Sequence, residues 1–298
     1  MKKILPIIII LALLLAGCGA YTPIKPAAPE ESAEPFLFTE DNYPAVDGST
    51  PMAPLAEAAA SVLLGKGADV TSRCFGGTDD AYLALLSGAA ELVIAPEPGE
   101  SALLELKAAD FETESAAICA DALVFIVNAD NPVDSLTLEQ LRGIYSGSIT
   151  NWKQLGGNDA EITAFQRMED SGSHGALLRL VMNGAAVAEA PEELIVADGE
   201  TLSAVKNFDG SAGAITYGSY FYAEDMQMAS GYKLLAVEGV TPDAGAIASG
   251  EYPLTLPVLA VISADEAEDS PARILWQWLQ GSEGRRLLTG CGYVIAED

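Results

Sequence analysis

One short stretch of the chain holds most of the side chains that could do chemistry. Residues 165–177 read FQRMEDSGSHGAL and contain Arg167, a serine on each side of a glycine, and His174, which is the one histidine of the sequence. Two kinds of site use such residues. A serine with a histidine could form the nucleophile and base of a hydrolase, whereas an arginine beside a Ser-Gly-Ser turn could bind an oxyanion without any chemistry.

The hydrolase arrangement is the less favoured of the two. Ser173 and His174 are adjacent, and adjacent side chains on a helix point about 100° apart, so a hydrogen bond between them is awkward. The stretch also lacks the G-x-S-x-G pattern of a nucleophile elbow. A histidine in the first turn of a helix is more often a solvent-facing side chain, and we expect this of His174. The sequence therefore predicts a binding protein rather than an enzyme.

The anion-binding arrangement depends on three turns that each precede a predicted helix. The first contains Ser49 and Thr50, either of which can cap a helix that begins at Pro51. The second contains Thr78 after paired glycines, and the third is the Ser-Gly-Ser turn at 171–173. Helix N-termini leave backbone N–H groups without intrahelical partners, and a hydroxyl adds another donor. Each turn alone could be an ordinary cap, so the prediction requires that the turns meet in space.

The charge of the chain limits what such a site can be. The sequence has 15 Lys and Arg against 43 Asp and Glu, a formal net charge of −28. This balance argues against nucleic acid as a partner, because phosphate-backbone binding requires clustered Lys and Arg. No long-range field would attract an anion either, so an anion site must consist of local, oriented donors.

The N-terminus is typical of an exported protein. A short basic region precedes an apolar stretch at 4–15 that is too short to cross a bilayer comfortably, which is the pattern of a signal peptide over 1–18. Its end, Leu-Ala-Gly-Cys, resembles the lipobox of bacterial lipoproteins and predicts lipidation of Cys18. The alternative is an uncleaved anchor helix with Cys18 buried. Residues 19–36 are rich in Pro, Ala and Glu and predict a flexible tether. Either way, the folded part is expected on the extracytoplasmic face of the cell membrane.

The remaining cysteines carry little functional signal. Cys74, Cys119 and Cys291 lack metal-ligand spacing, and no C-x-x-C occurs. One disulfide with one free thiol, or three small buried side chains, would both be compatible with the sequence. No cluster of acidic residues and histidine has the spacing of a metal site, so we expect no metal and no cofactor.

The pattern along the chain predicts an α/β fold. Several nearly continuous apolar runs predict strands buried on both faces of a sheet, at 91–97, 122–128, 161–167, 213–219, 232–238 and 254–262. Helical patterns lie between them. The best defined follows Thr137, which can form a capping box with Gln140, and two short helices broken at Gly281 are expected near the end. A length of 298 residues is sufficient for two lobes.

Several of these stretches resemble the phosphate-binding proteins of bacterial ABC importers, within the type II periplasmic-binding-protein class. The resemblance extends from about Tyr43 to the C-terminus and rests on YPAVDGSTPMAPLAEAAA, IYSGSITNWKQLGG (144–157), RMEDSGS (167–173), GAITYGSYFYA and YPLTLPVLAVI. It implies a two-lobed fold in which each lobe is a mixed sheet flanked by helices and crossing strands join the lobes. The implied first lobe is 37–120 plus 254–298, and the implied second lobe is 121–253.

The resemblance also implies ligand and partner. The ligand would be inorganic phosphate or a related oxyanion, the partner an ABC permease, and we expect a monomer. Arg167 falls on the ligand arginine of the family and Glu169 on the acid that orients it. The expected ligand-binding residues are Ser49, Thr50, Thr78, Arg167, Ser171, Gly172 and Ser173. A non-transport envelope lipoprotein, such as a sensor or adhesin, stays an alternative.

Two departures from the family affect the identity of the ligand. The family often has an aspartate that accepts a proton from phosphate and helps to exclude sulfate, whereas this sequence has Pro96 or Glu97 near that place. Glu97 is expected to substitute for it. Pro51 follows Thr50 where the family offers a backbone N–H, and proline has none.

Overall fold

The computed structural model describes residues 36–65, 75–196, 213–226 and 231–297. The predicted signal peptide with Cys18, the predicted tether up to residue 35, and Cys74 lie outside the described residues. Residues from Leu37 onward form one compact unit, and everything below concerns that unit. None of the helices in the described ranges is long and apolar enough to cross a membrane.

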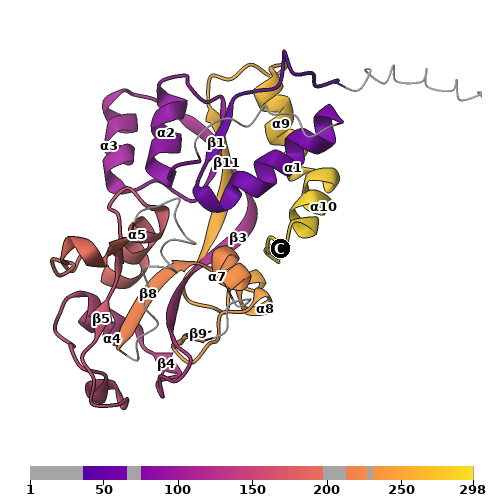
Figure 1. Ribbon diagram of the computed structural model, residues 1–298. Coiled ribbons are helices and arrows are strands. Elements are labelled where there is room, and N and C mark those ends of the chain that lie inside the picture. Colours follow the sequence, from indigo (N-terminus) through magenta and orange to yellow (C-terminus); the bar gives the residue numbers. More distant parts are fainter. Residues whose placement is uncertain (1–35, 66–74, 197–212, 227–230, 298) are drawn as a thin grey trace, which may run out of the picture. The chain divides into compact units, whose positions relative to one another are not determined.

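A mixed seven-stranded sheet forms the centre of this unit (Figure 1). Its strand order is β1-β2-β11-β3-β8-β5, and β9 pairs with β3 on the edge opposite β8. The strands of the sheet are β1 (Val46–Gly48), β2 (Leu92–Ala95), β3 (Thr113–Asn128), β5 (Thr163–Ala164), β8 (Ala214–Ser219), β9 (Tyr232–Leu234) and β11 (Thr255–Ser263). Two further pairs are β4 (Ser135–Leu136) with β10 (Ala236–Val237), and β6 (Gln166–Arg167) with β7 (Ile195–Val196).

Helices surround the sheet (Figure 1). The α-helices are α1 (Ala53–Leu64), α2 (Thr78–Leu86), α3 (Glu100–Ala108), α4 (Leu138–Tyr145), α5 (Gly172–Ala176), α7 (Tyr220–Met226), α8 (Ala244–Ala248), α9 (Pro271–Gln280) and α10 (Ser282–Gly290). Shorter 3-10 turns are η1 (Thr50–Met52), η2 (Trp152–Leu155) and η4 (Glu192–Leu194), and a π-turn, η3 (Leu177–Met182), continues α5. The α/β class predicted from the apolar runs is confirmed.

The long strand β3 connects two parts of the core. Its first half, up to Ala122, pairs with β11, and its second half, from Leu123, pairs with β8 and β9. Figure 1 shows β3 and β11 side by side, with α1, α2, α3, α9 and α10 around one end of the sheet and α4, α5, α7 and α8 around the other. One hydrophobic cluster packs on the second half of β3, and two others pack around β1, β2 and β11. Strands β3 and β11 therefore cross from one core to the other.

The predictions that rest on the strongest local sequence signals are confirmed by the structure. Thr137 and Gln140 form the predicted capping box at the start of α4, with hydrogen bonds of 2.8 and 3.1 Å. The break between α9 and α10 falls at Gly281, and Asn183 with φ 46° ends the helical segment that begins at Gly172.

Two predicted strands are broken in the structure. The run 161–167 is divided at Phe165, because β5 pairs with β8 whereas β6 leaves the sheet and pairs with β7. The run 232–238 is divided at Leu235 into β9 and β10 in the same way. Periodicity cannot show such divisions, since an apolar run looks the same whether it joins one partner or two.

The cysteines of the described ranges are not cross-linked. Cys119 is buried in β3 and Cys291 is half-buried at the end of α10, and both are free thiols. Burial raises the pKa of the Cys119 thiol well above its usual value.

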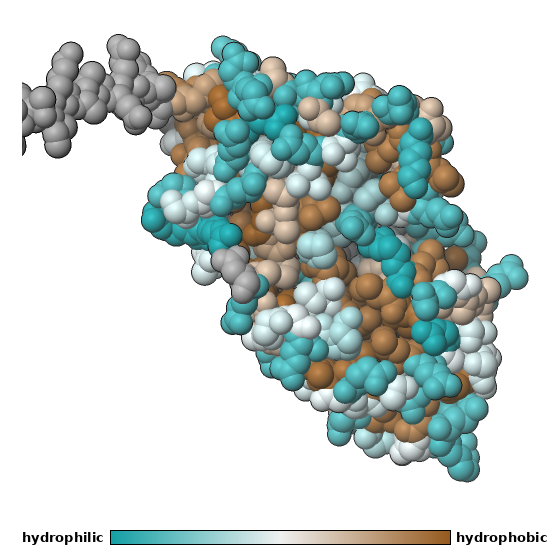
Figure 2. All heavy atoms as spheres, turned by 180° about the vertical axis from the view of Figure 1, so that it is seen from behind, coloured by the Kyte–Doolittle hydropathy of each residue, from teal (hydrophilic) through white to brown (hydrophobic). Residues whose placement is uncertain are grey.

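Seen from behind, the surface shows hydrophobic residues between hydrophilic ones (Figure 2). Such a mixture is expected when half of the residues are hydrophobic, because a folded protein has too little polar surface to cover itself.

Candidate functional site

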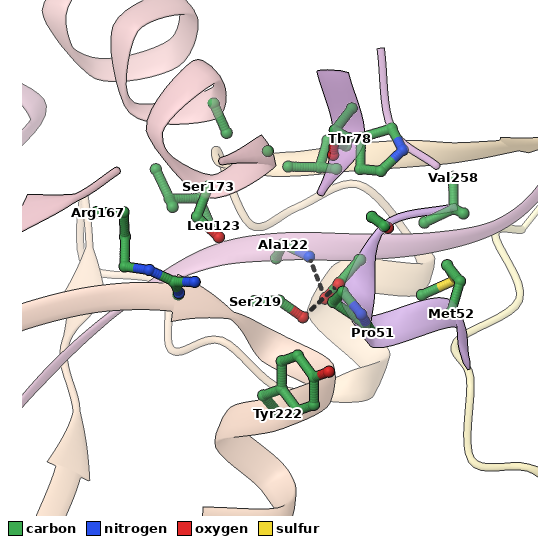
Figure 3. Close-up of a pocket in the computed structure, with 17 residues that line it drawn as sticks. Pro51, Met52, Thr78, Ala122, Leu123, Arg167, Ser173, Ser219, Tyr222 and Val258 are labelled. Carbon is green, nitrogen blue, oxygen red and sulfur yellow. Dashed lines mark hydrogen bonds between the residues drawn. The ribbon is translucent and has the colours of Figure 1, made fainter. Parts of the chain in front are cut away.

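A small cavity lies where residues from distant parts of the sequence meet (Figure 3). Its water-accessible volume is about 40 Å³. Ser49 approaches it from the end of β1, Thr78 from the start of α2, Arg167 from β6, and Gly172 with Ser173 from the start of α5. The structure thus brings together all three of the turns that the sequence singled out.

Not every predicted ligand residue lines this cavity. Thr50 is half-buried in η1 and does not line it. Ser171 is buried behind the cavity wall, where its Oγ accepts a hydrogen bond from the backbone N–H of His174 at 3.1 Å. Ser171 therefore acts as the N-cap of α5.

The hydroxyl groups of Ser49 and Thr78 make the cavity a site for a hydrogen-bonding ligand. Both side chains are buried, with 6% and 0% of their surface exposed, and neither oxygen has a hydrogen-bond partner among the described residues. The same holds for Thr50 Oγ1. Buried hydroxyls are rarely left without partners, because the lost hydrogen bonds to water cost free energy. Two such oxygens from residues that line one cavity therefore point to a ligand that accepts hydrogen bonds.

Arg167 supplies positive charge to this cavity. Its side chain is 4% exposed, and Figure 3 shows the guanidinium directed into the cavity toward Ser219. The strand that carries it is held from behind, since the Arg167 N–H donates to the hydroxyl of Tyr217 at 3.0 Å. The planar guanidinium suits oxyanions because it can donate two parallel hydrogen bonds.

Glu169 does not have the predicted orienting role in this structure. It is exposed, and no ion pair between its carboxylate and Arg167 is present. The chain turns sharply after Arg167, with the Ser171 N–H donating to the Met168 carbonyl at 3.0 Å. This turn carries Glu169 to a second cavity on the other side of α5.

Asp121 was missed by the sequence analysis. It is the one acidic side chain among the described residues that line the cavity, and it is 6% exposed. Its carboxylate accepts hydrogen bonds from the N–H groups of Ala122 (2.8 Å) and Phe221 (3.1 Å) and from the hydroxyl of Ser219 (2.5 Å) (Figure 3). Burial raises the pKa of Asp121 despite these donors. A lone charge within the apolar run 115–127 was the available signal.

Glu97 does not take the place expected for a proton-accepting acid. It is exposed and does not line the cavity, whereas the preceding Pro96 does. The prediction for Glu97 is therefore not met. Strand β2 ends at Ala95, and the acidic group is instead provided by β3.

The wall opposite Arg167 is largely apolar. Pro51, Met52 and Val258 form part of it, together with the ring of Tyr222. Pro51 has no N–H to offer a ligand, and its carbonyl accepts a hydrogen bond from the Tyr293 hydroxyl at 2.7 Å.

His174 is buried, so the expectation of a solvent-facing ring is wrong. Only 8% of its surface is exposed, and Nδ1 lies 3.1 Å from the hydroxyl of Tyr217. Burial lowers the pKa of its imidazole, which the nearby Glu169 partly offsets. No hydrogen bond joins the ring to Ser173 in the described part of the chain. The two residues are therefore not arranged as a nucleophile and base.

Known proteins are similar to this chain in sequence and in fold. Residues 39–279 match the family model described as PBP superfamily domain. The phosphate-binding protein PstS of Bacillus subtilis (strain 168) is 28% identical over 190 residues, which are 60% of this chain and 58% of that protein. This chain thus matches a little over half the length of that relative.

Solved structures match over more of the chain. A substrate-binding protein from Clostridium perfringens, solved with bound phosphate, is 24% identical with a TM-score of 0.68 and covers 86% of this chain and 100% of its own. An ABC-type phosphate transport receptor from Vibrio cholerae is 25% identical with a TM-score of 0.65, over 84% of this chain and 99% of its own. These matches confirm the resemblance to the PstS-type proteins. The chain belongs to the PBP superfamily and has the type II periplasmic-binding-protein fold.

Proposed function

We propose that this protein is a solute-binding protein that captures inorganic phosphate, or a related oxyanion, and delivers it to an ABC permease. The observation that carries the proposal is the cavity in which Arg167 faces the buried, unpartnered hydroxyls of Ser49 and Thr78. Relatives named for phosphate binding support it. The protein binds its ligand and performs no chemistry on it.

The size of the cavity favours a small ligand. A buried water molecule needs about 10–15 Å³ of accessible volume, so the cavity of about 40 Å³ accommodates roughly three waters or one tetrahedral anion. The net charge of −28 gives no general attraction for anions. Affinity would come from donors that are already oriented and desolvated, which also makes the site selective by hydrogen-bond geometry.

The two-lobe division predicted from the sequence suggests how this site would bind and release an anion. With lobes of 37–120 plus 254–298 and of 121–253, Ser49 and Thr78 belong to the first lobe and Arg167 with the 172–173 turn to the second. An anion bound between them would hold the lobes together, and their separation about β3 and β11 would release it.

The proposed location follows from the N-terminal pattern. Lipidation at Cys18 would hold a monomer on the extracytoplasmic face of the cell membrane, and residues 19–36 would let it reach its permease. A single lipid anchor keeps the binding unit at the surface where transported solute is needed.

Calorimetry with phosphate, sulfate and molybdate tests the proposed function directly. Arg167→Ala is expected to weaken phosphate binding at least about a hundredfold, or about 2.7 kcal/mol, because the other donors then face the anion without a charge partner. Arg286→Ala is the matched control, since Arg286 is exposed and pairs with Glu283. A folded wild-type protein that binds none of the three anions would refute the function, and an unchanged Arg167→Ala would refute the site.

A substitution of Gly172 tests whether the Ser171–Ser173 turn and the start of α2 approach each other closely at the cavity. A Cβ added at Gly172 would lie 2.3 Å from Thr78 Oγ1, which is too close for any side chain. Gly172→Ala is therefore expected to displace the Thr78 hydroxyl and reduce phosphate affinity at least about tenfold, or about 1.4 kcal/mol. Gly290→Ala, at an open position of α10, should bind as the wild type does. Equal affinities of the two variants in calorimetry would contradict the close approach of the walls.

Asp121 is proposed to take the proton-accepting role that the resemblance placed near Glu97. A carboxylate beside an anion is tolerated when the anion supplies a proton to share, which sulfate at neutral pH does not. Asp121→Asn keeps an oxygen for the Ala122 and Phe221 N–H groups. We expect it to raise sulfate affinity relative to phosphate at least about tenfold, while exposed Glu97→Gln leaves the ratio unchanged. A constant ratio in Asp121→Asn would exclude this role.

Lipidation is tested separately in cells. Wild-type protein is expected to incorporate a labelled fatty acid and to sediment with membranes, because two acyl chains on a lipidated cysteine give stable anchoring where one does not. Cys18→Ser should lose the label and appear in the soluble extracytoplasmic fraction. Label retained in Cys18→Ser would show that the anchor is elsewhere.

A further inference from the structure

A line of hydrogen bonds runs behind the anion cavity and ends at the only histidine of the chain. The Arg167 N–H donates to the Tyr217 hydroxyl at 3.0 Å, and His174 Nδ1 lies 3.1 Å from the same oxygen. All three residues are buried, with 4%, 2% and 8% of their surface exposed. The Tyr217 ring packs against Phe125 and Tyr145, with ring centroids 6.1 and 5.2 Å away, so the hydroxyl is held in place.

The protons on this line can be assigned from the chemistry of the groups. A backbone N–H can only donate, so the Tyr217 oxygen accepts from Arg167 and has its own proton to give. Neutral His174 with its proton on Nε2 can accept that proton at Nδ1. In the charged imidazole both nitrogens donate, so the hydrogen bond reverses: the Tyr217 oxygen accepts from Nδ1–H and its own proton turns away from the ring.

His174 is also tied to the turn that forms the other part of the cavity wall. Its N–H donates to Ser171 Oγ at 3.1 Å, and it directly follows the cavity-lining Ser173. One residue therefore links the strand of Arg167, through Tyr217, to the Ser171–Ser173 turn. The Ser171 N–H also joins these two parts of the wall, because it donates to the Met168 carbonyl at 3.0 Å.

We propose that His174 is a positioning residue, whose neutral imidazole holds Arg167 and the Ser171–Ser173 turn in the arrangement that binds the anion. The inference rests on the proposed oxyanion-binding function and adds to it a dependence on the protonation of one side chain. His174 touches no ligand in this role, since it does not line the anion cavity.

The charged groups around the His174 ring indicate that protonation of the ring would affect anion binding through geometry rather than through the charge of the imidazole. The imidazole lines the second cavity, on the far side of α5, where Asp79, Glu100 and Glu169 provide three carboxylates and Arg179 one cation. A proton gained by His174 would therefore lie among compensating carboxylates and away from the anion. The reversal of the Tyr217 hydrogen bond is then the change that reaches Arg167.

Two substitutions separate positioning from packing. In His174→Asn the amide oxygen lies two bonds from Cβ, as Nδ1 does, so it can accept the Tyr217 proton without titrating. His174→Leu fills similar space and accepts nothing. At pH 8 we expect wild type and His174→Asn to bind phosphate within about threefold of each other, and His174→Leu to bind about tenfold more weakly.

The pH dependence of phosphate affinity distinguishes the positioning role of His174 from a merely structural role, which would not change with pH. Because burial lowers the pKa of His174 below its ordinary 6.5, the ring is neutral at pH 8 and charges as the pH falls below that value. Wild type should then lose up to about tenfold in affinity relative to His174→Asn between pH 8 and pH 5. The ratio of the two proteins cancels the titration of phosphate itself.

The results distinguish the inference from the proposed function. If wild type binds no oxyanion at pH 8, the function fails. If it binds and His174→Leu equals it at all pH values, the positioning role is overturned. Wild type that gains affinity over His174→Asn in acid would also overturn it, since the charge would then act directly. Independently of any ligand, nitrogen NMR of the single histidine, in protein without a histidine tag, should show the Nε2–H tautomer, and Tyr217→Phe should abolish that preference.

Discussion

The proposed function places one constraint on the structure, which is that a strongly acidic chain would have to hold an anion away from water. Among the described residues lining the cavity, Arg167 is the one cation, and it faces the neutral donors of Ser49 and Thr78. Neutral donors in a desolvated site are effective because the local dielectric constant is low and no solvent must be reorganised. They are also selective, since an anion that cannot satisfy them leaves buried hydroxyls without partners.

The crossing strands make this arrangement geometrically attainable. Strand β3 pairs with β11 over its first half and with β8 over its second half, so that the change of partner falls beside Asp121. Both the acidic group and Ser219 at the end of β8 enter the cavity at that point. A site between two cores can open and close as those cores move, which a site within one rigid core cannot do.

The hydrogen bonds behind the cavity show how a binding wall is supported. Arg167 is useful only if its strand and the Ser171–Ser173 turn keep their relative position, and Tyr217 with His174 lies between them. This support explains why a histidine next to a serine is no sign of catalysis here. His174 lines the second cavity and does not line the anion cavity.

The sequence alone determined the helix caps, the helix break and the hydroxyl-bearing turns, because caps and the pairing of glycine with hydroxyl residues are local signals. It thus predicted α4 with its capping box, the break at Gly281 and the turns at Ser49, Thr78 and 171–173. Only the tertiary structure decided that Asp121 rather than Glu97 faces the cavity, that Glu169 leaves Arg167, and that His174 is buried. These outcomes depend on which strand changes partner and where a turn points, and neither is encoded within a short window of residues.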